Sequence, residues 1–293
     1  MRAFLALLRR EYLEHRGAFL YAPLILIGLF TLIIFMAFVS GHYRFSGSAG
    51  NAFSRIFDLG YFAIAVLWTG YGFIAVFFYF ADAFNADRRN NAMLFWKSMP
   101  QSDFKILLSK MTAGLTTLPA LLFIAMLVTG IIAGVATLIA PYFLPVLGPP
   151  DPTRTATTWA EFSVVVLVYE VLALLWFAPF FAWVGGLSTV VGRWSIPLAL
   201  LIPVIVSLFE GVVDFGSAPG GSYVLSFLRQ RMTFTAGSQD LQVVLFANAP
   251  IDMPQVIQHL LAAMDWPSTL GGLVFSFVVI ALASLYRRRS LKG

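Results

Sequence analysis

The sequence predicts an all-α integral membrane protein with six transmembrane helices. Of its 293 residues, 59% are hydrophobic and only 11% are charged, whereas soluble domains carry about 25% charged residues. Six apolar stretches are long enough to cross a bilayer core, which takes about 20 helical residues. These stretches are continuously apolar rather than alternating, and an open sheet would leave backbone groups unpaired in lipid. Helices are therefore expected as the spans.

An amphipathic helix is expected before the first span. Met1–Arg16 mixes apolar with charged residues, and Leu5, Leu8 and Tyr12 fall at helical spacing. This pattern is typical of a helix lying in the membrane interface. Its apolar part is too short for the core of a cleavable signal peptide, so Ala18–Ser40 is expected to remain as the first span.

The other five predicted spans follow in order along the chain. The fourth contains Glu170 and the fifth contains Glu210, near its outer end. An ionisable group inside a span is by default a hypothesis for a functional site, so both acids are candidates for the transport pathway. The five spans are Leu59–Ala81, Met111–Leu138, Phe162–Gly185, Trp194–Val213 and Ser268–Tyr286.

An external insert, Asp214–Pro267, is expected before the last span. It begins with a glycine-rich stretch and then contains two predicted helices, Ser222–Phe234 and Met253–Met264. Asp252 is the expected N-cap of the second of these helices. The insert is therefore predicted to be helical rather than an unstructured connection.

The distribution of Lys and Arg predicts the orientation. Fourteen of the 19 Lys and Arg residues fall on the side that holds Met1–Arg16, the Asp82–Lys110 loop, Arg193 and the C-terminal tail, and five fall on the other. Cytoplasmic loops carry the excess of Lys and Arg. Both termini and this loop are therefore expected in the cytoplasm, and the net charge of +5 reflects membrane topology rather than nucleic-acid binding.

The sequence contains none of the usual catalytic or cofactor motifs. It has no cysteine, and its histidines, His15, His42 and His259, lack the spacing of metal ligands. A nucleotide-binding P-loop is also missing, so any ATP hydrolysis is expected from another chain. No cofactor, metal or catalytic residue is predicted for this chain.

The loop between spans two and three has an unusual composition. Asn91–Ser98 is predicted to form a short helix whose apolar part, Met93–Trp96, is flanked by basic residues. Pro100 ends this helix, and Ser102 is placed to cap the next. An aromatic knob on a cytoplasmic loop suits docking into a soluble partner, but an interfacial helix lying on lipid fits equally well.

Two segments resemble a known family. Residues 9–17, R-R-E-Y-L-E-H-R-G, and residues 87–103, which contain D-R-R and L-F-W-K-S-M-P-Q-S-D, resemble permeases of bacterial ATP-binding-cassette (ABC) transporters, type-2 exporter class. Leu13 stands where the family usually has Trp, and Met99 stands where it usually has Leu. The layout of interfacial helix, spans, loop and insert is similar over the whole chain.

The resemblance implies a permease subunit in the bacterial inner membrane. A separate cytoplasmic ATPase would bind ATP and Mg, and a second permease chain, identical or not, would complete the unit. The loop would contain a coupling helix that contacts the ATPase. The coupling residues implied in this way are Arg88, Arg89, Leu94, Phe95, Trp96, Lys97 and Asp103.

Three rival functions remain open at this point. An intramembrane enzyme would need catalytic pairs that the spans do not show. An ion-coupled transporter normally has more polar residues within its spans and often has internal repeats. A membrane anchor or sensor subunit would need fewer spans than six.

Overall fold

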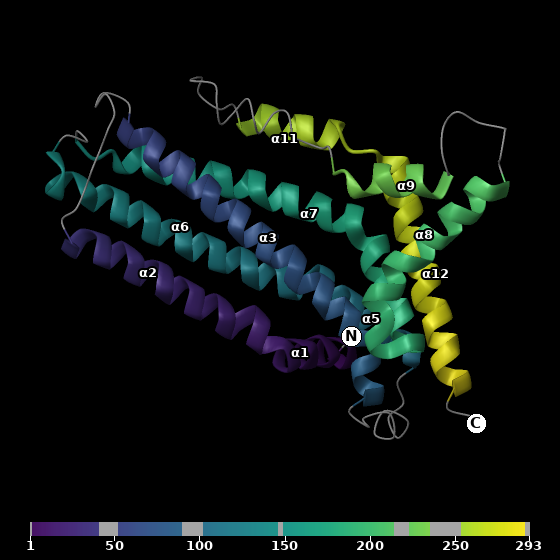
Figure 1. Ribbon diagram of the computed structural model, residues 1–293. Helices are drawn as coiled ribbons and strands as arrows, with labels where there is room; N and C mark the ends of the chain where they lie inside the picture. The colour runs from purple at the N-terminus through teal and green to yellow at the C-terminus, as the bar shows by residue number, and fades with distance from the viewer. Residues whose placement is uncertain are drawn as a thin grey trace.

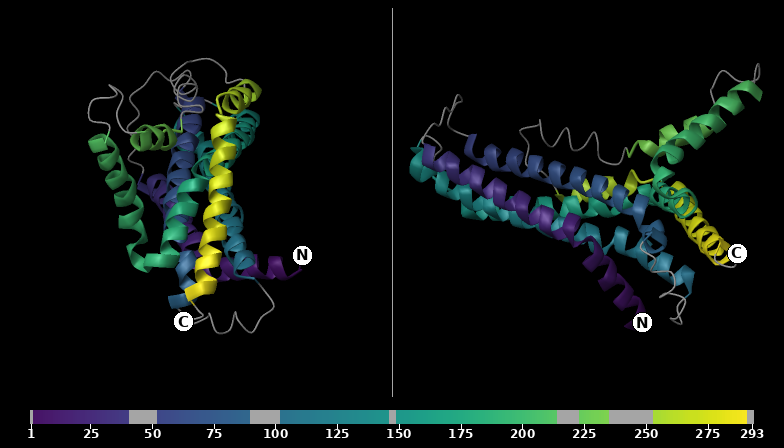
Figure 2. Two further views of the ribbon diagram at one scale, coloured as in Figure 1. Left: turned by 90° about the vertical axis from the view of Figure 1, so that its right-hand side faces the viewer. Right: turned by 60° about the horizontal axis from the view of Figure 1, so that its bottom comes forward.

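The computed structural model describes residues 2–40, 52–89, 102–145, 149–213, 223–234 and 253–290, and every regular element in these ranges is a helix. Figure 1 shows the long helices gathered in one bundle, with both ends of the chain at the same end of it. The view from the side in Figure 2 agrees with this placement of the two ends. The predicted all-α class is confirmed for this part of the chain.

The N-terminal segment consists of two helices joined by a bend. A π-helical turn, η1 (Gly17–Tyr21), connects α1 (Arg2–Arg16) to α2 (Ala22–Ser40). π-Helical turns are a known cause of sharp kinks, and Figure 2 shows α1 turned away from the axis of α2. The helix expected before the first span is therefore confirmed as a separate element.

The next helices lie on either side of the loop that is predicted to be cytoplasmic. α3 (Ala52–Arg89) extends past both ends of its predicted span, whereas the third span is divided at Thr116 into α5 (Asp103–Leu115) and α6 (Thr117–Phe143). The predicted cap of α5 is confirmed, because the Ser102 hydroxyl accepts a hydrogen bond from the backbone of Lys105 at 3.3 Å. The predicted helix 91–98 lies outside the described residues.

The chain reverses direction after its longest helix. α7 (Pro152–Val191) is followed by a short 3-10 turn, η3 (Gly192–Trp194), and by α8 (Ser195–Val213). Gly192 has a φ of +59°, a conformation that glycine adopts without strain at the end of a helix. The left panel of Figure 2 shows α8 running back along one edge of the molecule.

Helices occupy most of the described residues between 223 and 290. α9 (Tyr223–Met232) and α11 (Met253–Ala262) correspond to the two helices predicted in the insert. α12 (Trp266–Ser290) contains the last predicted span. The proposed cap Asp252 lies outside the described residues.

Five stretches of the described chain are helical, long and apolar enough to cross a membrane. The fourth of them runs from Pro152 to Glu210 and contains both α7 and α8, so two predicted spans fall within one stretch. The prediction of a protein with several membrane-spanning helices is confirmed at this level. The five stretches are Ala3–Ser40, Phe57–Asp87, Asp103–Phe143, Pro152–Glu210 and Trp266–Arg289.

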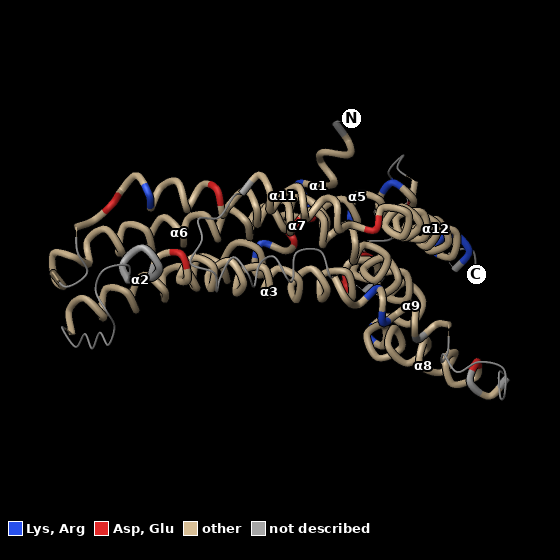
Figure 3. Tube along the Cα trace, turned by 90° about the horizontal axis from the view of Figure 1, so that it is seen from above, with Lys and Arg blue, Asp and Glu red and all other residues tan. Residues whose placement is uncertain are grey.

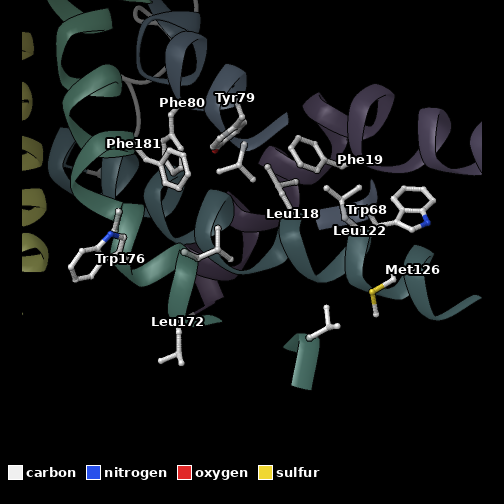
Figure 4. Packing of buried hydrophobic residues seen from close by; sticks show 14 of the residues in the cluster. Phe19, Trp68, Tyr79, Phe80, Leu118, Leu122, Met126, Leu172, Trp176 and Phe181 are labelled. Atoms are coloured by element: carbon white, nitrogen blue, oxygen red, sulfur yellow. The ribbon is translucent and has the colours of Figure 1, made fainter. Parts of the chain in front are cut away.

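The core is aromatic and lies between α3, α6 and α7. Tyr61, Phe80 and Phe84 on α3 are almost completely buried, and Phe80 stacks on Phe181 of α7 with ring centroids 5.3 Å apart. Figure 4 shows this stack beside Tyr79, in the part of the bundle that also holds Leu118. By contrast, most of the apolar side chains on α2 and α8 are exposed, as expected of helices that face lipid or another chain.

Candidate functional site

Four ionisable side chains are buried together where α1, α3, α5 and α12 meet. Lys110 Nζ lies 3.0 Å from Glu11 Oε1 and 3.6 Å from Asp87 Oδ2. Arg287 Nη2 lies 3.3 Å from the same Asp87 oxygen. Two acids thus face two bases, which is the balance that buried charges require. These four residues, Glu11, Asp87, Lys110 and Arg287, are called the charge cluster.

Further polar groups surround the charge cluster. Arg10 Nη2 lies 3.4 Å from Asp87 Oδ1, and the Tyr79 hydroxyl lies 3.0 Å from Glu11 Oε2. Asp103 Oδ1 lies 4.0 Å from Arg287 Nε. Figure 3 shows long uncharged stretches along the helices, with charged residues near α1, α5 and α12, near α8 and α9, and at the opposite end of the bundle.

The charge cluster fixes both ends of the loop between α3 and α5. Asp87 lies at the end of α3, while Lys110 lies on α5, just after the loop. Asp87 also contacts Arg287 of α12, and Lys110 contacts Glu11 of α1. These ion pairs therefore connect both ends of the loop to α1 and α12.

Only one of the seven predicted coupling residues has a described side chain. Asp103 lies in the first turn of α5, at the edge of the charge cluster, and its carboxylate faces Arg287. Arg88 and Arg89 form the last turn of α3. Residues 94–97 (Leu94, Phe95, Trp96 and Lys97) lie outside the described part of the chain.

A group of possible metal-binding atoms adjoins the cluster. Ligand atoms of Glu11, Glu14 and His15 lie within 4.8 Å of one another. However, Glu11 pairs with Lys110, and Glu14 pairs with Arg10 at 2.6 Å. Because each carboxylate already faces a cation, the arrangement suits ion pairing within the bundle better than metal binding.

Glu170 lies beside an apolar groove. It is near the middle of α7, and its Oε1 accepts a hydrogen bond from the Thr69 hydroxyl of α3 at 3.1 Å. The groove has a volume of about 570 Å³ and lies between α5, α6, α7 and α12. Its walls are mainly aliphatic and aromatic, with Met111, Leu115, Phe123, Leu174, Leu273 and Phe277 among the lining residues.

The second predicted pathway acid has different surroundings. Glu210 Oε2 accepts a hydrogen bond from the backbone N–H of Val224 at 3.1 Å. This contact joins the end of α8 to the start of α9, and Glu210 is not among the residues that line the groove. The two candidate acids are thus not brought together, and the position of Glu210 suits holding the insert.

A buried arginine attaches the insert to the bundle. Arg231 of α9 is 2% exposed, and its guanidinium carbon lies 4.2 Å from the centre of the Trp176 ring on α7. Its Nη2 donates to the backbone oxygen of Ser268 on α12 at 2.9 Å. A Cβ at position 272 would collide with this guanidinium, so Gly272 is what admits it. The distribution of Lys and Arg predicts only that Arg231 is one of the five charges on the external side.

The start of α12 carries its own cap next to Arg231. The Asp265 carboxylate accepts hydrogen bonds from the hydroxyl and the backbone N–H of Ser268, at 2.6 and 3.1 Å. These hydrogen bonds lower the pKa of Asp265, and its charge in turn opposes the effect of burial, which lowers the pKa of Arg231. The carboxylate therefore remains charged beside the guanidinium at neutral pH.

No known protein family, curated protein or solved structure matches the chain.

Proposed function

We propose that this chain is the transmembrane subunit of an ABC-type exporter, which moves its substrate across the bacterial inner membrane with energy from a separate ATPase chain. The observation that carries the proposal is that the two motif segments meet in space. Residues 9–17 supply Glu11 and Arg10, and residues 87–103 supply Asp87 and Asp103, all in or around one buried charge cluster.

The charge cluster suits the transmission of a movement. A partner that pushes on the loop displaces the ends of α3 and α5, and the buried ion pairs carry this displacement to α1 and α12. ATP binding to the ATPase would then favour one arrangement of the spans over another. Such coupling requires only that the two arrangements bind the ATPase dimer with different affinity.

In the proposed topology α7 and α8 are separate spans. The reversal at Gly192 turns the chain back across the membrane, which gives six spans with both termini in the cytoplasm. The insert with α9 and α11 is then external. The apolar side chains exposed on α2 and α8 provide surfaces for lipid and for the second permease chain, identical or not, of the working unit.

The test replaces the aromatic pair predicted to contact the ATPase. Phe95→Ala with Trp96→Ala is expected to abolish retention of the ATPase and ATP-driven transport, because truncating an aromatic anchor costs about 2 kcal/mol or more. The matched control is Tyr142→Ala with Phe143→Ala, an exposed aromatic pair at the other end of the bundle. Both proteins must reach the membrane in equal amounts. Full ATPase retention and transport in the first variant would refute the proposal.

An ion-coupled transporter is the second candidate, favoured by the carboxylate of Glu170 beside the groove. It predicts uptake or efflux in proteoliposomes under a proton or sodium gradient, with no ATPase chain present. The exporter proposal predicts no transport in that experiment. Adding the ATPase and ATP to the same proteoliposomes should then start transport.

A further inference from the structure

The polar groups of the apolar groove accept hydrogen bonds but donate none to its interior. The hydroxyls of Thr112, Thr116 and Ser276 line the groove, and each donates its proton to a backbone oxygen of its own helix at 2.6–2.9 Å. A hydroxyl that has used its proton presents only lone pairs. Glu170 is the single ionisable side chain among the described residues that line the groove.

The size and position of the groove suit a small lipophilic molecule. Its volume of about 570 Å³ falls in the range of small-molecule sites, roughly 300–1,000 Å³. Val171 and Phe277, two of its lining residues, are 49% and 56% exposed. Because both lie within the stretches that are apolar enough to span the membrane, the groove opens sideways toward lipid rather than toward water.

We propose that the groove binds a cationic amphiphile, with the ammonium group on Glu170 and the apolar chain along α6 and α12. This inference rests on the proposed function and names the class of substrate that the exporter would take. A protonated amine donates hydrogen bonds and carries a positive charge. The described groove lining contains no Lys or Arg that could pair with the Glu170 carboxylate. An apolar chain finds aliphatic and aromatic walls.

An anionic amphiphile of the same length is excluded by the same geometry. Its head group would face the acceptor-only hydroxyls and the carboxylate, with no cation among the described lining residues. Placing an unpaired charge at membrane depth is costly. A neutral alcohol of equal length should bind more weakly than the amine, because it donates one hydrogen bond and has no charge.

The experiment is photolabelling of the full-length chain in nanodiscs of phosphatidylcholine, without the ATPase. The probe is dodecylammonium that carries a diazirine near the end of its chain, and the matched probes are the corresponding alcohol and carboxylate. Labelled peptides are identified by mass spectrometry, and unlabelled amine is added as competitor. We expect saturable labelling by the amine within α6, α7 and α12, with the carboxylate at background.

Two variants and one control test the contribution of each part. Glu170→Gln should weaken amine labelling by about tenfold or more, as expected for loss of a charge-assisted hydrogen bond, and should leave alcohol labelling unchanged. Ala120→Trp fills the groove from α6 and should remove labelling by both probes. Glu161→Gln, an exposed acid on the same helix outside the groove, should change neither.

Three outcomes would overturn the proposal. Equal labelling by amine, alcohol and carboxylate, unaffected by Glu170→Gln, would mean that the groove holds lipid chains without selecting a head group. Labelling outside the groove would mean that the amine binds elsewhere. Absence of amine labelling in the groove, together with cross-links from the groove to a second copy of the chain, would mean that the groove is an interface between two copies. None of these results depends on the ATPase. If the Phe95→Ala and Trp96→Ala variant refuted the exporter proposal, the photolabelling result would therefore still be valid.

Discussion

Lys110 Nζ lies 3.0 Å from Glu11 Oε1, and neither residue is more than 2% exposed. This pair joins α1, which precedes the first predicted span, to α5, which follows the loop after α3. A surface pair of the same geometry would contribute at most about 1 kcal/mol. A buried pair differs because removing one partner leaves an uncompensated charge in an apolar environment.

The first prediction concerns this buried pair. Lys110→Met should lower the free energy of unfolding by about 3–5 kcal/mol, because Glu11 then loses its ammonium partner. Adding Glu11→Gln should restore part of that loss. Thermal or denaturant unfolding of the protein in detergent micelles measures both effects.

The control for the buried pair is Lys105→Met on the same helix. Lys105 is exposed, so its replacement should change the stability by no more than a few tenths of a kcal/mol. Equal effects at positions 105 and 110 would show that the charge cluster does not stabilise the fold.

The second prediction concerns the close approach of α6 to α3. A Cβ on Gly130 would collide with the ring of Tyr61 and would lie 2.9 Å from Trp159 Nε1. Gly130→Ala should therefore destabilise the bundle by about 1–3 kcal/mol, the usual cost of overpacking.

Gly70→Ala is the control, since nothing lies within 4 Å of the added Cβ. It should be neutral or stabilising, because alanine favours helix by about 1 kcal/mol over glycine. The same unfolding measurement should separate the two variants, and equal stability would contradict the packing argument.

The helices could be predicted from the sequence because continuous apolar runs and local caps determine them. The cap by Ser102 and the helices α9 and α11 are examples in which a few neighbouring residues decide the outcome. The length of α7 could not be predicted in this way. Its first residues, from Pro152, are polar, and hydropathy does not detect a helix that extends beyond the apolar region.

The charge cluster was not predictable from the same patterns. Glu11, Asp87, Lys110 and Arg287 lie far apart in the sequence. Counting Lys and Arg for topology treats Lys110 and Arg287 as solvated loop charges and leaves the two acids out. Only their tertiary arrangement shows that they neutralise one another. Glu170 was identified from the sequence as an acid within a span, but the groove beside it depends on how four helices pack.

The third prediction uses the absence of cysteine in the sequence. Single cysteines at Gly47, Asp151 and Gly237 should react with a membrane-impermeant maleimide added to intact cells. A cysteine at Gln101 should react only after the membrane is opened, because the Lys and Arg distribution places its loop in the cytoplasm. External labelling at position 101 would invert the proposed topology.

The last prediction concerns how the insert is held. Arg231 packs on Trp176 and donates to Ser268, so it links α9 to both α7 and α12. A desolvated contact between a guanidinium and an indole contributes about 2 kcal/mol. Arg231→Ala should therefore raise the population in which α9 is detached by roughly thirtyfold.

Limited tryptic cleavage after the exposed Arg229 measures this opening from outside, because a protease acts on the detached form. Arg231→Lys should also speed cleavage, although less, since an ammonium retains the charge but lacks the planar group that stacks on the ring.

Gly272→Ala should also speed cleavage without any change in α9, because its methyl group occupies the space of the guanidinium. Gly271→Ala on the same helix has nothing within 4 Å of its added Cβ and is the control. If Gly272→Ala cleaves no faster than Gly271→Ala, the arginine does not hold the insert in the way described, and the hydrogen bond from Trp176 Nε1 to the backbone oxygen of Arg231 at 2.8 Å would suffice for it.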